Sequence, residues 1–238
     1  MNPSDYKYKI EMHCHTYPVS KCSHASPEQL VDLYKAAGYD AVVITDHINY
    51  TYRLRERYAT DYDAAEYFLS GYRQAKEYGD KVGMKVILGM EYCADGHDIL
   101  VYGIDEEFVH KTVPYVNAPL WMFREDLKDD NTLIINAHPF RGGVCELDDK
   151  NLDGAEVFNF CPGDRDRNGL IARYAKEHNI GIITCGSDFH IPGEEDMICL
   201  RTKVLPKDSF EIARILKSMD YVLDILGNII IPYGFKGE

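Results

Sequence analysis

The sequence has no apolar run long enough to cross a lipid bilayer. Its longest runs, such as Ala41–Ile44 and Ile229–Ile231, are far shorter than the roughly 20 residues of a spanning helix. The N-terminal residues carry charges where a signal peptide would have an apolar stretch, so we expect no secretory leader. A membrane is therefore not an expected partner.

Two further groups of motifs are absent. The seven cysteines are scattered and include no Cys-x-x-Cys pair, which favours reduced thiols and a cytoplasmic location over a disulfide framework. The sequence also lacks G-x-G-x-x-G and G-x-x-x-x-G-K-[ST]. No motif therefore supports a dinucleotide-binding or P-loop protein.

Basic residues are in the minority. Lys and Arg number 26 against 39 Asp and Glu, so the net charge is −13. An acidic surface repels phosphate backbones, so long nucleic acid is not an expected ligand, although a local basic or metal-filled pocket can hold one phosphate. With 45% hydrophobic and 27% charged residues, the composition is that of a globular protein, and we expect one domain over residues 1–238.

Short apolar runs alternate with longer amphipathic runs, which predicts alternating strands and helices. The expected strands are Lys7–His13, Ala41–Thr45, Val86–Met90, Ile99–Tyr102, Leu133–Ala137, Ala155–Phe158 and Gly181–Cys185. The expected helices are one that starts at Pro27 after the N-cap Ser26 and ends at Gly38, then Asp63–Tyr78, Leu120–Leu127, Gly169–His178 and Ser209–Met219. This order predicts an α/β fold with a parallel sheet, as a TIM-like barrel of about seven strands or, alternatively, a doubly wound open sheet.

Histidine and acidic residues recur at the ends of the predicted strands. They are His13 and His15 in His-Cys-His, Asp46 and His47 in Thr-Asp-His, Glu91 in Gly-Met-Glu-Tyr, His138 in Ala-His-Pro-Phe, and Asp188 and His190 in Ser-Asp-Phe-His. Because the C-terminal ends of barrel strands converge on one mouth, these side chains are expected to meet there. Imidazole and carboxylate groups together predict a site for Zn²⁺, Mn²⁺ or Fe²⁺.

The spacing within two motifs supports a shared ion. Residues i and i+2 of an extended chain point the same way, so His13 and His15 can bind one metal while Cys14 faces away. Asp188 and His190 repeat this spacing. Glu91 is the best candidate for a carboxylate that bridges two metals.

In this order, the motifs resemble those of the PHP (polymerase and histidinol phosphatase) superfamily, from about Tyr6 to Ile191. The resemblance implies a distorted (β/α)₇ barrel with two or three divalent metal ions (Zn, Mn or Fe), most often hydrolysing phosphoesters. It also implies three metal positions, whose ligands are His13, His15, Glu91 and Asp188 at the first, Glu91 and His138 at the second, and His47 and His190 at the third.

Two positions depart from the pattern of the family. Members commonly have Asp or His a few residues before a Pro-Glu helix start, and counting back from Pro27 places Cys22 there. A thiolate can bind zinc, so Cys22 is the expected ligand, and His24 is the alternative on ligand chemistry.

The second departure lies before Tyr102-Gly103, where many relatives have a histidine. Alignment on this pair places Asp98 at the ligand position, not His97. Neighbouring residues of a strand face opposite sides, so only one of the two can bind the metal. We expect Asp98 to be the ligand.

The sequence offers two substrate-binding candidates. Arg141 follows His138, and its guanidinium can hold a phosphate oxygen through parallel hydrogen bonds. Asn159 ends a predicted strand and can face the mouth.

The expected function is that of a metal-dependent phosphoesterase acting on a small phosphate ester, such as a histidinol-phosphate-like compound, a nucleotide or another phosphomonoester. The metals would lower the pKa of water from about 16 toward 7, and the hydroxide would attack phosphorus in line. Glu91, Asp188 and His190 are the expected catalytic residues. The alternatives are a metal-dependent hydrolase of a non-phosphate substrate and a metal-stabilised scaffold without turnover.

Overall fold

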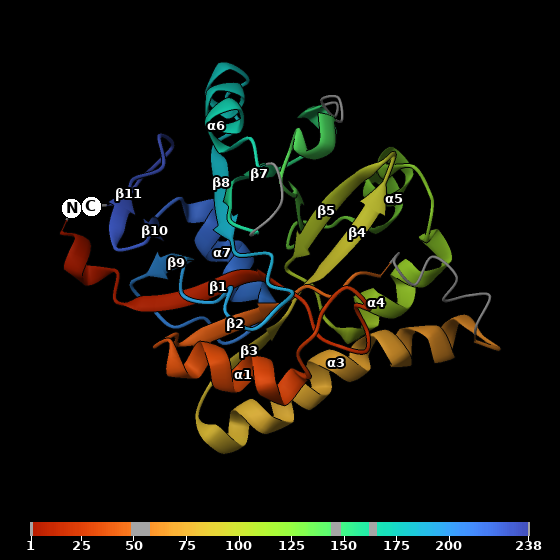
Figure 1. The fold of residues 1–238 in the computed structure, drawn as a ribbon. Coiled ribbons are helices and arrows are strands. Elements are labelled where there is room, and N and C mark those ends of the chain that lie inside the picture. Colours follow the sequence, from red (N-terminus) through yellow and green to blue (C-terminus); the bar gives the residue numbers. More distant parts are fainter. Residues whose placement is uncertain (1, 49–57, 144–148, 162–165, 238) are drawn as a thin grey trace.

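The computed structural model of the protein describes residues 2–48, 58–143, 149–161 and 166–237, whose strands form two sheets (Figure 1). The first sheet has six strands in the order β11-β10-β9-β1-β2-β3 and the second has five in the order β4-β5-β6-β7-β8. The bounds of the first are β1 Tyr8–Cys14, β2 Ala41–Ile44, β3 Lys85–Leu88, β9 Ile198–Thr202, β10 Val222–Ile225 and β11 Asn228–Ile230. The bounds of the second are β4 Met90–Ala94, β5 His97–Tyr102, β6 Leu133–Asn136, β7 Gly154–Asn159 and β8 Ile182–Gly186.

Helices connect and cover these sheets. They are α1 Pro27–Ala36, α3 Asp61–Val82, α4 Glu106–Thr112, α5 Leu120–Leu127, α6 Asn168–Glu177 and α7 Ser209–Ser218, with short 3₁₀ turns at Pro3–Asp5, Val113–Tyr115, Arg141–Gly143 and Asp149–Asn151. In Figure 1, α1 and α3 lie together beneath β1, β2 and β3. No helix of the described residues has the length and apolar character of a membrane span.

The local signals for α1 are confirmed. Ser26 caps the helix by accepting a hydrogen bond from the amide of Gln29, and the Gln29 side chain accepts in return from the Ser26 amide. Pro27 occupies the first turn. Beyond the helix, Gly38 adopts a φ of +79°, a left-handed conformation that glycine accommodates without strain.

The central core lies between the two sheets. It takes Ile10 and Val43 from the first sheet and Leu100 and Ile135 from the second. Two further apolar cores lie between the sheets and the helices that cover them. One includes residues of α1, the other includes residues of α4 and α5, and residues of α3 belong to both. This packing holds the strand ends of both sheets near one another, where the acidic and histidine motifs lie.

The expected parallel barrel is confirmed only as a mixed α/β fold. The pairs β1–β2, β2–β3, β6–β7 and β7–β8 are parallel, but β4–β5, β5–β6, β1–β9, β9–β10 and β10–β11 are antiparallel. Within the residues described, the two sheets do not close into one barrel.

The strand expected at Val86–Met90 is instead divided at Gly89. A side chain there would place its Cβ 2.9 Å from Val43 Cγ1, so only glycine fits against β2 at this point. The chain leaves the first sheet as β3 ends and enters the second as β4 begins. Glu91 therefore lies on β4, at the transition between the sheets.

The strand at Ile99–Tyr102 was expected to be parallel, but it belongs to a hairpin. Asp95 and Gly96 have φ values of 55° and 82°, and Ala94 pairs with His97 across this two-residue turn. An Asp-Gly turn with two positive φ values matches the twist of an antiparallel pair. The hairpin brings β5 back beside β4.

Candidate metal centre

The histidine and acidic motifs meet where the two sheets touch. Two isolated bridges join the sheets there, one between Cys14 and Phe189 and the other between His47 and Glu91. Each bridge adjoins the predicted ligands. The site therefore lies at both junctions between the sheets.

Four of the predicted ligands form one buried group. The ligand atoms of His13, His15, Glu91 and Asp188 lie within 4.8 Å of one another. The Nε2 atom of His13 is 3.4 Å from Glu91 Oε2 and 3.3 Å from Asp188 Oδ1, and that of His15 is 3.3 Å and 3.0 Å from the same oxygens. Cys14 packs in an apolar core instead, as the spacing predicted.

Several polar atoms of this group have no hydrogen-bond partner. His13 Nε2 and both carboxylate oxygens of Glu91 are buried without one. The other ring nitrogen of His13 donates to Glu156 at 3.0 Å, so Nε2 is the nitrogen that faces the carboxylates of Glu91 and Asp188. Buried polar atoms are rarely left unsatisfied, and a divalent cation would satisfy all three. The residues therefore fit a metal ion.

The electrostatics favour ionised carboxylates. Burial raises the pKa of Glu91, but the charges of His47 and His13 outweigh it and hold the pKa well below the usual value. Burial also raises the pKa of Asp188, and His13 and His15 outweigh it, so that this pKa is lowered as well. For His15, burial followed by the charge of His47 lowers the pKa to about 3, which keeps the ring neutral. Anionic carboxylates and a neutral imidazole are the forms that bind metals.

A second group shares the carboxylate of Glu91. Glu91, Asp98 and His138 have ligand atoms within 4.8 Å of one another, and His138 Nε2 lies 3.3 Å from Glu91 Oε1. Because Cys93 pairs with Asp98 across the hairpin, Asp98 lies on the same face as Glu91, and His97 lies on the opposite face. The structure thus brings Asp98 and not His97 into the cluster.

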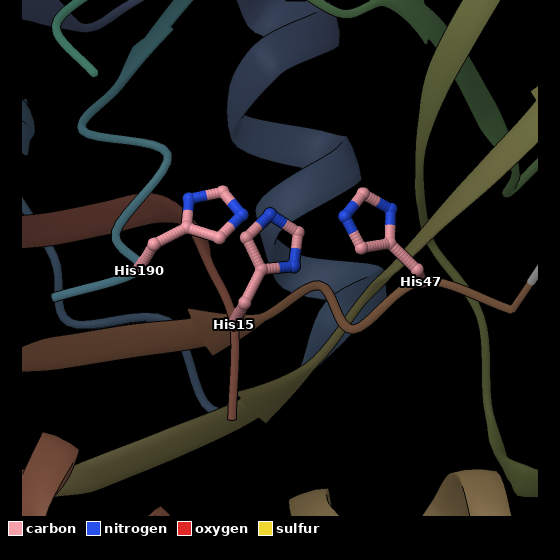
Figure 2. Close-up of side chains that lie close together, drawn as sticks. All are labelled: His15, His47 and His190. Carbon is pink, nitrogen blue, oxygen red and sulfur yellow. The ribbon is translucent and has the colours of Figure 1, made fainter. Parts of the chain in front are cut away.

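A third group consists of three histidines. The ligand nitrogens of His15, His47 and His190 lie within 4.8 Å of one another. Figure 2 shows the rings of His47 and His190 each turning a nitrogen toward the ring of His15 between them. His190 Nδ1 donates to the carbonyl of Asp188 at 2.6 Å, and His47 Nδ1 is 2.8 Å from Glu91 Oε2. The Nε2 atoms of both rings thus lie toward the third position.

Cys22 is half-buried beside this third group. Its thiol hydrogen bonds with His190 and His47, and these bonds outweigh burial and lower the pKa of the thiol to about 7. His24, in contrast, is exposed, and its amide donates to the carbonyl of His190. Cys22 therefore lies beside the third group while His24 is exposed, and the assignment of Cys22 as a ligand stays a prediction.

We expect Cys22→Ala to weaken Zn²⁺ binding at the position of His47 and His190 by more than about 100-fold, because loss of a neighbour that merely orients a ligand already costs about 10–100-fold. His24→Ala is the matched control and should bind Zn²⁺ as the unsubstituted protein does. Competitive metal titration of both variants measures the difference. Equal affinities for the two variants would exclude Cys22 as a ligand.

The two predicted substrate-binding residues contact each other. Arg141 donates to Asp188 Oδ2 at 2.6 Å, to Asn159 Oδ1 at 2.6 Å and to Asp166 Oδ1 at 2.9 Å. Arg141 also lines a cavity of about 120 Å³ together with Asp98, His138, His97 and Phe140. The guanidinium therefore lies at the edge of the metal cluster, beside space for a small group.

Sequence reasoning missed the residues that support the ligands. Glu156 accepts a hydrogen bond from His13 Nδ1. Asp46 accepts one from the hydroxyl of Ser20, and this hydroxyl lies 3.4 Å from His15 Nδ1. Asp46 also accepts a hydrogen bond from the hydroxyl of Thr16, so its carboxylate supports the segment around His15. Cys161, at 4.0 Å from His190 Nδ1, was also missed, because no spacing in the sequence links it to a motif.

The family model described as PHP domain matches residues 11–231. No curated protein sequence matches this chain.

Three solved structures share the fold at low sequence identity. A two-domain protein from Bacteroides vulgatus ATCC 8482 that contains a predicted PHP-like metal-dependent phosphoesterase has a TM-score of 0.61 and 15% identity, covering 93% of this chain and 66% of its own. A proposed metal-dependent phosphoesterase from Bifidobacterium adolescentis ATCC 15703 has a TM-score of 0.52 and 16% identity, covering 89% and 96%. PsfC from Pseudomonas syringae PB-5123 has a TM-score of 0.57 and 17% identity, covering 82% and 81%.

Proposed function

The chain belongs to the PHP domain family, and from this premise and the geometry of the site we propose that it is a metal-dependent phosphoesterase acting on a small phosphate ester. Two of the similar structures are described as metal-dependent phosphoesterases, which supports the reaction class. The substrate is proposed to be a phosphomonoester, such as a histidinol-phosphate-like compound or a nucleotide.

One observation carries this proposal. Both oxygens of Glu91 are buried without hydrogen-bond partners, and each faces different histidines. Oε2 lies near His13, His15 and His47, and Oε1 lies near His138. A carboxylate placed between separate sets of imidazoles is suited to bridge two divalent ions, and paired ions are common in phosphatases.

We propose three metal positions held by the chain. The ligands are His13, His15, Glu91 and Asp188 at the first, Glu91, Asp98 and His138 at the second, and Cys22, His47 and His190 at the third. When bound there, divalent ions would supply Lewis-acid activation of water and of the phosphoryl group. Imidazole with a thiol at the third position favours Zn²⁺ there, and the extra carboxylate of Asp98 admits a harder ion such as Mn²⁺ at the second.

The residues at the edge of the cluster would bind and orient the substrate. Arg141 carries a planar, permanently charged guanidinium that can hold two phosphoryl oxygens and offset the charge that grows on them. Asn159 accepts a hydrogen bond from one N–H group of Arg141, and Asp188 accepts one from another. These two bonds fix the plane of the guanidinium. The cavity beside Asp98 and His138 would receive the group attached to the phosphate.

A phosphate-release assay tests this function. We expect the purified protein to release phosphate from small phosphomonoesters when Mn²⁺ or Zn²⁺ is supplied and to lose that activity on chelation. Arg141→Gln is expected to lower kcat by about 10²–10³-fold, the usual cost of removing one donor from a developing anion.

Arg173→Gln is the matched control, because the Arg173 side chain is 75% exposed on α6 and forms an ion pair with Glu177, away from the ligand groups. It should retain full activity. Metal-dependent cleavage of amides or cyclic compounds without any release of phosphate from esters would assign the site to another hydrolase class. Metal binding without turnover of any of these substrates would identify a scaffold.

A further inference from the structure

We propose that Glu156 is a positioning residue that links the first metal position, the second metal position and the substrate-binding arginine. Glu156 lies on β7, is fully buried, and belongs to none of the ligand groups. The inference rests on the metal centre of the proposed function, which it extends to a residue that binds neither metal nor substrate.

The first link reaches His13. Glu156 Oε1 accepts from His13 Nδ1 at 3.0 Å, which fixes the proton on that nitrogen. The Nε2 lone pair of His13 is therefore presented to Glu91 and Asp188. A carboxylate behind an imidazole sets both the tautomer and the orientation of a metal-binding histidine.

The second link reaches the backbone of His138. Its amide donates to Glu156 Oε2 at 3.1 Å. His138 has a φ of 27°, a conformation that is unfavourable for a residue with a side chain and that persists only where its surroundings hold it. The hydrogen bond to Glu156 helps to fix this backbone conformation. It thereby sets the position of the His138 imidazole beside Glu91.

The third link reaches Arg141 through Asn159. Asn159 Nδ2 donates to Glu156 Oε2 at 2.8 Å, which orients the amide so that Oδ1 accepts from Arg141 at 2.6 Å. Three N–H donors thus converge on one carboxylate. No other side chain of the described residues accepts from His13, His138 and Asn159 together.

The strand geometry makes room for this arrangement. A Cβ at Gly186 on β8 would lie 2.8 Å from Glu156 Oε1 and 2.4 Å from the Cβ of His13. Glycine at this position lets β8 pass directly over the contact between the two side chains. The carboxylate is therefore enclosed and has no space to turn away from its donors.

Glu156→Gln tests the proposal, because glutamine has nearly the same shape but only one accepting oxygen. If its amide group faces His13, the imidazole must move its proton to Nε2 and lose its ligand lone pair. If the amide group faces the other way, it opposes the N–H groups of His138 and Asn159. Either arrangement is expected to weaken Zn²⁺ binding by about 10–100-fold.

Glu11→Gln is the matched control. Glu11 is also a fully buried carboxylate with N–H donors, but these are the amides of Met12, His13 and Ser187, and it contacts neither an imidazole nitrogen nor Asn159. Zn²⁺ affinity is measured by competitive titration, and the His13 tautomer is read by ¹⁵N NMR of the Zn²⁺-loaded protein. We expect Glu11→Gln to leave both unchanged.

If Glu156 only stabilised the fold, Glu156→Gln would lower the free energy of unfolding and leave Zn²⁺ affinity unchanged. Unchanged affinity together with an Nδ1–H signal for His13 in Glu156→Gln would overturn the proposal, as would an equal loss of affinity in Glu11→Gln. If Glu156→Gln does not fold, Glu156→Asp takes its place with the same readouts, because it withdraws the carboxylate by one methylene. If the unsubstituted protein bound no Zn²⁺, the metal centre itself would be refuted, which is a different result.

Discussion

Replacing Glu91 by glutamine is expected to abolish turnover while the chain remains folded. Glu91 is the one residue that the first and second ligand groups share. Glutamine keeps the shape but removes the charge, and its amide N–H₂ would face the Nε2 lone pairs of either His13 or His138. We expect the loss to exceed about 100-fold, since a residue that only orients a ligand already contributes about 10–100-fold.

Steady-state kinetics, elemental analysis and circular dichroism of Glu91→Gln measure turnover, metal content and folding. Asp224→Asn is a suitable control, because Asp224 is a buried carboxylate on β10 that pairs with Arg201 outside the ligand groups. Its metal content and activity should be normal. A folded Glu91→Gln protein with most of its activity would contradict the bridging role.

Replacing Gly186 by alanine is expected to disrupt the site through space alone. The new Cβ would lie 2.4 Å from the Cβ of His13, which is closer than real Cβ atoms approach. Strand β8 or His13 must move, and such overpacking typically costs about 1–3 kcal/mol of stability. A displacement of His13 by about 1 Å would lower activity by about 10²-fold.

Thermal unfolding and kcat of Gly186→Ala measure these two effects. Gly169→Ala provides the contrast, because a Cβ at Gly169 on α6 would meet nothing within 4 Å. That substitution should leave activity unchanged and raise stability by up to about 1 kcal/mol, since alanine favours helix more than glycine does. If Gly186→Ala retained normal activity, the close approach of β8 to His13 would not matter for the site.

The ligand motifs were predictable because each depends on local geometry. The i, i+2 spacing of His13 and His15 is enough to place both on one side of an extended chain, and it does so here. Asp188 likewise follows its predicted strand and meets them. The choice of Asp98 over His97 agreed with the structure, but the reason lies in the hairpin register, which had not been predicted.

The sheet arrangement was predicted less well, for two reasons. The Asp95-Gly96 pair is a hairpin signal that was overlooked in favour of a regular alternation of parallel strands. The strands β9, β10 and β11 follow the last predicted strand and were not predicted, and β10 and β11 join through a second two-residue turn at Leu226-Gly227.

The supporting residues were beyond sequence reasoning for a different reason. Glu156 lies 143 residues after His13, and nothing local to β7 indicates that its carboxylate turns toward β1. The bond between Asn159 and Arg141 likewise depends on how β7 lies beside the loop after β6. Such contacts arise from the packed fold and not from spacing along the chain.

The position of the site between the two sheets has a consequence for folding. His13 lies on β1 of the first sheet and His15 directly follows it, whereas Glu91 lies on β4 of the second sheet and Asp188 follows β8. Two isolated bridges join these segments beside the site. An ion held by all four would act as a cross-link between the sheets that the unfolded chain cannot offer. Binding and folding are then thermodynamically linked, and free metal at 100 times its dissociation constant would add about 2.7 kcal/mol to the free energy of unfolding. The metal supply would thus set how much of the chain is folded as well as how fast it turns over substrate.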